Sequence, residues 1–110
     1  MTKIITAAVL VEMIRTRGAM SVIGRATLAL YKRQTSEEQN ELYTKNQNGV
    51  GFSAFDAKVG SLTAVYFRDN GTLLPWHIAY WSKVAPNGYP KICRYAKQLN
   101  EIAAAKEAAR

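Results

Sequence analysis

Apolar residues recur three and four positions apart along most of this chain, and no segment alternates convincingly between apolar and polar residues. The first spacing places side chains on one face of an α-helix, whereas alternation is what a half-buried strand requires. Glycine, proline and asparagine interrupt the pattern repeatedly, and no linker or internal repeat divides it. We therefore expect an all-α fold, a compact single-domain bundle of five to six short helices over residues 1–110. Its alanine-rich end, residues 103–110, is expected to fray.

Local signals place the ends of these helices. Gly18 supplies a C-terminal stop for the first helix, and Ser21 can cap the second. Ser53 and Asp56 have the spacing of a capping box that opens the fourth, and Pro75 fits the first turn of the fifth. The expected helices span residues 4–17, 21–33, 35–43, 53–70, 75–84 and 90–103. The apolar stripe of the fourth is expected to contain Phe55, Val59, Leu62, Val65 and Tyr66.

The chain lacks the residues of a metal or catalytic centre. A zinc site needs about four ligands at defined spacings, and the sequence offers one histidine, His77, and one cysteine, Cys93. A nucleophilic triad would need the same histidine beside an activated serine or cysteine. We therefore expect no metal, no cofactor and no enzymatic activity. His77 is expected at the surface or at the edge of the core, and Cys93 as a buried structural thiol.

The apolar run near the N-terminus, residues 4–11, is too short to span a membrane and is followed at once by Glu12 and Arg15. No small-residue cleavage site follows it, as a signal peptide would require. We expect a soluble cytoplasmic protein with no membrane partner.

Basic residues give the strongest functional signal. The chain has 15 lysines and arginines against 8 acidic residues, a net charge of +7. An excess of this size favours association with nucleic acid or with acidic proteins, although a basic helix face is equally often only solvated. Three-residue spacing puts Lys91, Arg94 and Lys97 on one helix face. The candidate phosphate contacts are Arg25, Lys32, Arg33, Lys91, Arg94 and Lys97.

Two further features have a functional and a structural interpretation. Asn48, Gly49 and Gly51 form a loop before a helix N-terminus, where free amides could hold a phosphate, but glycines that turn the chain explain the loop better. Most aromatic residues match the apolar stripes and are expected in the core. Trp81 and Tyr89 are the best candidates for exposed residues that stack on bases or anchor a partner. The two helices around Gly18 could also form a helix-turn-helix, a weaker alternative.

Several short motifs resemble one family. They are Arg33-Gln34-Thr35 with Glu38, Asn48-Gly49-Val50-Gly51-Phe52 with Asp56-Ala57, Gly71-Thr72-Leu73, and Arg94-Tyr95-Ala96-Lys97-Gln98-Leu99. In order and spacing they resemble a small bacteriophage and mobile-element domain found near helicase-like and replication proteins. The resemblance covers about residues 28–103 and departs at Leu74-Pro75-Trp76-His77. It implies a phage-type context and a DNA-transaction setting, without a known reaction.

These observations support two functional hypotheses. The first is a small, non-catalytic nucleic-acid-binding accessory protein of phage or mobile-element origin. The alternative is a protein-binding inhibitor of a host defence nuclease complex, similar to an anti-CRISPR protein, in which Trp81 and Tyr89 would be anchors. The sequence does not decide which partner, replication complex or defence complex, would be bound.

Overall fold

A computed structural model describes residues 4–33 and 51–108, and within them the chain is all-α. The helices are α1 (Ala7–Arg17), α2 (Ala19–Arg33), α4 (Ala57–Asn70), α5 (Pro75–Ser82) and α6 (Ala96–Ala108), with the 3₁₀ helix η1 (Lys91–Tyr95) leading into α6. The described residues contain no β-strand, only an isolated bridge between Val84 and Pro90. The predicted all-α fold is confirmed. The expected helix at residues 35–43 lies outside the described residues.

The first two helices end at Arg17 and Arg33, as predicted, but they begin at Ala7 and Ala19. The Thr6 side chain accepts a hydrogen bond from the Val9 amide at the start of α1, which satisfies one of the free amides there. Gly18, with φ of 93°, ends α1 and donates its amide to the Ile14 carbonyl. A side chain disfavours this backbone conformation, so glycine is needed here. The predicted cap at Ser21 is wrong, because α2 already begins at Ala19.

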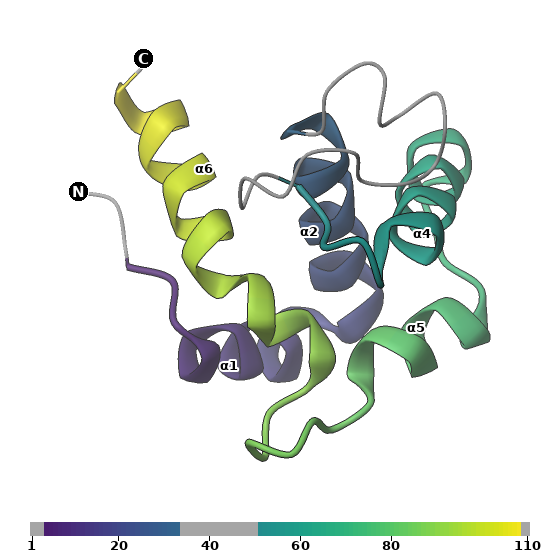
Figure 1. The fold of residues 1–110 in the computed structure, drawn as a ribbon, viewed down its shortest axis with the longest axis horizontal. Helices are drawn as coiled ribbons and strands as arrows, with labels where there is room; N and C mark the ends of the chain where they lie inside the picture. Colours follow the sequence, from purple (N-terminus) through teal and green to yellow (C-terminus); the bar gives the residue numbers. More distant parts are fainter. Residues whose placement is uncertain (1–3, 34–50, 109–110) are drawn as a thin grey trace.

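Helices α2 and α4 lie side by side, α1 lies below α6 and contacts α2, and α5 lies below α4 (Figure 1). The contact between α2 and α4 is close because α2 has a glycine there: a Cβ atom on Gly24 would lie 2.3 Å from the Phe67 ring of α4. A second glycine, Gly60 of α4, lies against the segment before the helix, where a Cβ atom would be 2.5 Å from the Phe52 ring. The two helices therefore approach most closely where Gly24 leaves room for the Phe67 ring.

The buried face of α4 differs from the predicted stripe. The helix buries its small residues, with Ala57 and Ala64 fully buried, and leaves Leu62 exposed. Phe55 lies before the helix and is 78% exposed, so the prediction that both belong to the core is wrong. The Phe67 ring, near the end of the helix, packs against Gly24 of α2. The large aromatic residue that fills the space is Phe52, from the preceding segment.

Gly60→Ala tests this close packing. Alanine favours a helix by about 1 kcal/mol over glycine, but the added methyl group would collide with a Phe52 ring that is only 1% exposed. We expect the free energy of unfolding to fall by about 1–3 kcal/mol, measured by urea denaturation. Combining the change with Phe52→Leu should recover part of the loss. A Gly60→Ala variant more stable than the parent would contradict the packing.

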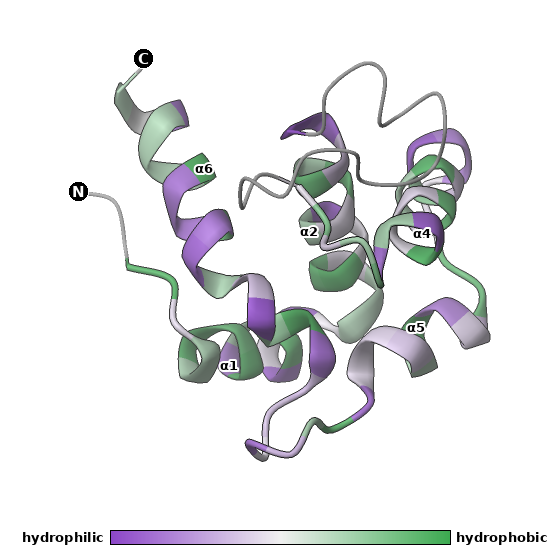
Figure 2. Cartoon of the chain, in the orientation of Figure 1, coloured by the Kyte–Doolittle hydropathy of each residue, from purple (hydrophilic) through white to green (hydrophobic). Residues whose placement is uncertain are grey.

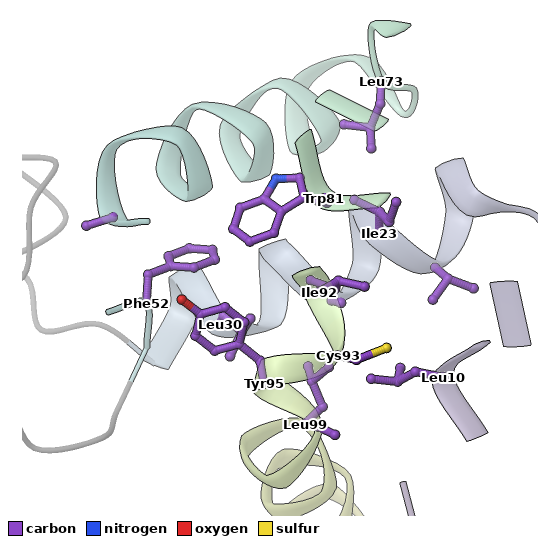
Figure 3. Close-up of a cluster of buried hydrophobic side chains, with 14 residues drawn as sticks. Leu10, Ile23, Leu30, Phe52, Leu73, Trp81, Ile92, Cys93, Tyr95 and Leu99 are labelled. Carbon is purple, nitrogen blue, oxygen red and sulfur yellow. The ribbon is translucent and has the colours of Figure 1, made fainter. Parts of the chain in front are cut away.

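The second half of the chain completes the core. Gly71, with φ of 70°, ends α4, and Pro75 occupies the first turn of α5 as predicted. The predicted start of the sixth helix at Pro90 is a 3₁₀ turn that becomes α-helical at Ala96. The alanine-rich end that was predicted to fray is helical through Ala108. Figure 3 shows the side chains that meet in the core: Leu10, Ile23, Leu30, Phe52, Leu73, Trp81, Ile92, Cys93, Tyr95 and Leu99.

Candidate nucleic-acid interface

The Asp56 carboxylate forms hydrogen bonds and ion pairs with side chains from several segments, and two of the predicted phosphate contacts are among its partners. Its side chain is fully buried. Tyr95 donates a hydrogen bond to Oδ2 at 2.6 Å, and Tyr80 donates one to Oδ1 at 2.8 Å. Lys91 Nζ lies 3.1 Å from Oδ1, and Arg94 lies 3.5 Å from Oδ2. We call these five residues the Asp56 network. The buried charge is thus both hydrogen-bonded and paired, as burial requires.

The structure corrects the prediction for Lys91. Its ammonium group donates to the Tyr80 hydroxyl at 3.0 Å and lies over the Tyr80 ring and the ring of Phe55. The Lys91 side chain is only 19% exposed, so its charge is used inside the molecule to neutralise Asp56. Arg94 differs, because its side chain is 53% exposed and its contact with Asp56 is longer. Lys91 is therefore removed from the candidate interface and Arg94 is retained.

Three groups of the network, Tyr80, Lys91 and Tyr95, have raised pKa values. Burial raises the pKa of Tyr95 to about 12. Burial also raises the pKa of Tyr80, partly opposed by its hydrogen bond to Lys91. For Lys91, burial alone would lower the pKa, but the hydrogen bonds to Tyr80 and Asp56 outweigh it and the pKa is raised. The two phenols therefore stay neutral and the Lys91 ammonium stays charged near neutral pH.

The predicted capping box at Ser53 and Asp56 is wrong. Asp56 precedes α4, but its side chain makes no capping hydrogen bond to the helix. Ser53 instead contacts Tyr95, whose hydroxyl accepts from the Ser53 amide at 3.2 Å. The segment before α4 is thereby fixed to η1.

Gly51 also helps to fix the segment before α4, through hydrogen bonds to Gln98 of α6. It has a φ of 79°, as expected for a turn glycine. Its amide donates to Gln98 Oε1 at 2.8 Å, and its carbonyl accepts from Gln98 Nε2 at 2.9 Å. The Gly51 amide is therefore occupied and not available to a phosphate. The other members of the predicted phosphate loop, Asn48 and Gly49, lie outside the described residues.

Arg33 is partly used inside the molecule. Its guanidinium lies 3.2 Å from the Glu101 carboxylate and close to the Gln98 side chain, and joins the end of α2 to α6. Its side chain is 27% exposed. This ion pair makes Arg33 a weaker candidate for phosphate contact than its exposed neighbour Lys32.

Arg25, Lys32 and Lys97 are exposed and form no ion pair with any residue that the structure describes. Arg25 and Lys32 are seven residues apart on α2 and so lie on the same face of that helix. Lys97 is one turn beyond Arg94, on the side of α6 away from Lys106. The predicted contacts are thus divided between α2 and the η1–α6 segment. Figure 2 shows hydrophilic residues at the end of α2 and along the first turns of α6.

Every acidic side chain in residues 4–33 and 51–106 is paired with a basic one. Glu12 pairs with Arg15, Asp69 with Arg68, Glu101 with Arg33, and Asp56 with Lys91. The remaining cations therefore have no acidic neighbour to neutralise them in that part of the chain. Besides the three above, the exposed unpaired cations are Arg17, Lys58, Lys83 and Lys106. These four were not among the predicted phosphate contacts, because the sequence shows nothing about them beyond their charge.

The two predicted aromatic anchors have different positions. Trp81 is fully buried, donates its indole N–H to Thr63 Oγ1 at 3.1 Å and contacts the rings of Phe52 and Tyr95. The prediction that Trp81 is an exposed anchor is therefore wrong. Tyr89 is 38% exposed, in the turn between α5 and η1, and stays a candidate.

His77 and Cys93 have structural surroundings. The His77 ring is buried between Tyr66 and Trp76, and its Nδ1 accepts a hydrogen bond from the Leu74 amide at 3.1 Å. It thereby caps α5, which accounts for a histidine at this place. Cys93 is buried as predicted, and burial raises the pKa of its thiol. Among the described residues, no group of three or more His, Cys, Asp or Glu side chains could hold a metal ion.

The cap at His77 predicts a dependence of stability on pH. Burial lowers the pKa of His77 below its usual 6.5, so its contribution is present above that pH and is lost as the pH falls through the folded-state value. Protonation of Nδ1 would also remove the acceptor for the Leu74 amide. We expect the melting temperature of the parent to fall more between about pH 7.5 and pH 5 than that of His77→Gln. Equal falls in the two proteins would contradict this role.

Comparison with protein-family models, with curated proteins and with solved structures found no match to this chain. The resemblance to a phage domain therefore stays a prediction. No helix in the described part of the chain is long and apolar enough to cross a membrane.

Proposed function

We propose that this protein is a small, non-catalytic nucleic-acid-binding accessory protein of phage or mobile-element origin, acting in the cytoplasm. It would contact phosphates through Arg25 and Lys32 on α2 and through Arg94 and Lys97 on the η1–α6 segment. The observation that supports this most is the pairing of the described carboxylates. Because each already has a basic partner, the exposed cations are left to attract an external polyanion.

The placement of these cations favours contact with the nucleic-acid backbone over recognition of bases. They lie on separate elements and no described helix presents a dense row of polar residues of the kind that reads base edges. Binding would then be electrostatic and weakly sequence-specific, with an affinity that falls steeply with salt. The alternative, an inhibitor of a defence nuclease, has less support because one of its two expected anchors, Trp81, is buried.

The test compares two double variants with the same change in net charge. Arg25→Ala with Lys32→Ala removes two cations that have no described partner, whereas Arg15→Ala with Arg68→Ala removes two cations already paired at the surface. Fluorescence anisotropy of labelled DNA should show the first pair weakening binding and lowering the slope of log K against log salt by about two. The second pair should change the slope by less than about one. Equal effects of the two double variants would refute contact through α2, because the net charge alone would then explain DNA binding.

A further inference from the structure

An apolar groove lies between α1, α2 and α6, apart from the Asp56 network. Its volume is about 190 Å³. Met13 of α1 and Ile102 of α6 line two sides, and Ala26 and Ala29 of α2 form the third. The groove exists because alanines face it: Ala103 on α6 and the two on α2 are too short to fill the space between the helices. Figure 1 shows α6 standing beside α2, with α1 across the lower end of both.

The rim of the groove is basic. Arg17, Arg25 and Lys106 line it, one from each of the three helices, and no acidic residue does. None of the three forms an ion pair with a residue in the described ranges. An apolar floor with cations at its edge matches an occupant that has an apolar face flanked by carboxylates.

We propose that this groove binds the apolar face of an acidic amphipathic helix from a partner protein. The floor would take two or three aliphatic side chains at helical spacing, and Arg17, Arg25 and Lys106 would pair with flanking glutamates or aspartates. This docking site is independent of the proposed nucleic-acid contacts on Arg94 and Lys97, although Arg25 would belong to both.

The size and charge of the groove favour an acidic helix over a small molecule, a second copy of this chain, a nucleic-acid base or a lipid bilayer. The volume is below the range of about 300–1,000 Å³ that small-molecule pockets usually have. A second copy of this chain would bring two basic rims together, in a protein that already carries a net charge of +7. The lining contains no aromatic side chain on which a base could stack. Concave walls from three helices also fit a cylinder better than the flat surface of a bilayer.

The first experiment is a titration with a designed peptide of about 18 residues, five helical turns, with leucines at helical spacing and glutamates elsewhere. We expect saturable binding by fluorescence anisotropy, with amide shifts in ¹⁵N-labelled protein confined to α1, α2 and α6. A peptide of the same composition with its leucines dispersed, and one with lysines in place of glutamates, should each bind at least about tenfold more weakly. Equal binding of either control peptide would overturn the proposal.

Variants of the groove provide the second experiment. Ala29→Phe fills the half-buried floor and should weaken peptide binding about tenfold or more, while DNA binding stays unchanged because no charge is altered. Arg17→Glu with Lys106→Glu should weaken the peptide similarly, and Lys58→Glu with Lys83→Glu, equal in charge but away from the groove, should have less than about a twofold effect. Circular dichroism must show each variant folded, and the two charge variants keep the test decisive if Ala29→Phe unfolds.

Two results would overturn the proposal in favour of another occupant. One is saturable binding of decanoate that Ala29→Phe abolishes while the acidic peptide does not bind. The other is a concentration-dependent dimer that Ala29→Phe dissociates. Loss of DNA binding in Arg94→Ala with Lys97→Ala, with peptide binding retained, would support two separate sites.

Discussion

Asp56→Asn is expected to lower the free energy of unfolding by about 3–5 kcal/mol, the usual cost of leaving one partner of a buried ion pair without the other. The substitution keeps the shape of the side chain but removes the charge that faces Lys91 at 3.1 Å and accepts hydrogen bonds from Tyr80 and Tyr95. Because the Asp56 carboxylate is fully buried, water cannot replace these contacts. Urea denaturation measures the loss.

Asp69→Asn is the matched control. Asp69 lies at the other end of the same helix and pairs with Arg68, but both side chains are more than half exposed. Its loss should cost less than about 1 kcal/mol. Adding Lys91→Met to Asp56→Asn should restore part of the stability, since it removes the ammonium group that the first change leaves unpaired. Equal, small losses for Asp56→Asn and Asp69→Asn would show that the Asp56 network contributes little to folding.

Trp81→Ala is expected to cost about 3–5 kcal/mol of unfolding free energy. The indole is fully buried, packs against Phe52 and Tyr95, and donates a hydrogen bond to Thr63. Truncation would leave a cavity lined by the rings of Phe52 and Tyr95, and the packed helices around it limit how far it can collapse.

Phe55→Ala is the control for this change, because Phe55 is 78% exposed. It should cost less than about 1 kcal/mol. These two expected losses of stability reverse the expectation from sequence, in which Phe55 belongs to the core and Trp81 to the surface. A larger loss of stability for Phe55→Ala than for Trp81→Ala would restore that expectation and contradict the packing described above.

The sequence predicted the elements that local chemistry determines. Gly18 and Gly71 end helices because they supply a backbone conformation that side chains disfavour, and Pro75 begins one because its missing amide costs nothing there. Periodicity gave the class of the fold for the same reason, since spacing within a helix is a local property. These signals involve residues only a few positions apart.

The features that sequence reasoning missed depend on contacts between distant residues. Asp56 has the spacing of a helix cap, but its partners Tyr80 and Tyr95 lie 24 and 39 positions further along. Apolar spacing indicated which faces of α4 are hydrophobic, but not that the Phe52 ring from the preceding segment would pack directly against Gly60, on the face that buries small residues. Spacing likewise predicted that Lys91 and Arg94 share one side of a helix, but it did not reveal the Asp56 carboxylate that both of them contact.

The salt dependence of DNA binding tests the central proposal most directly. Fluorescence anisotropy of labelled single- and double-stranded DNA, titrated with the unmodified protein between about 50 and 200 mM salt, would give the slope of log K against log salt. We predict binding at the lower salt that weakens steeply at the higher, with a slope corresponding to about three or four phosphate contacts. Absence of binding at about 50 mM salt would contradict the nucleic-acid function and leave the exposed cations to an acidic protein partner.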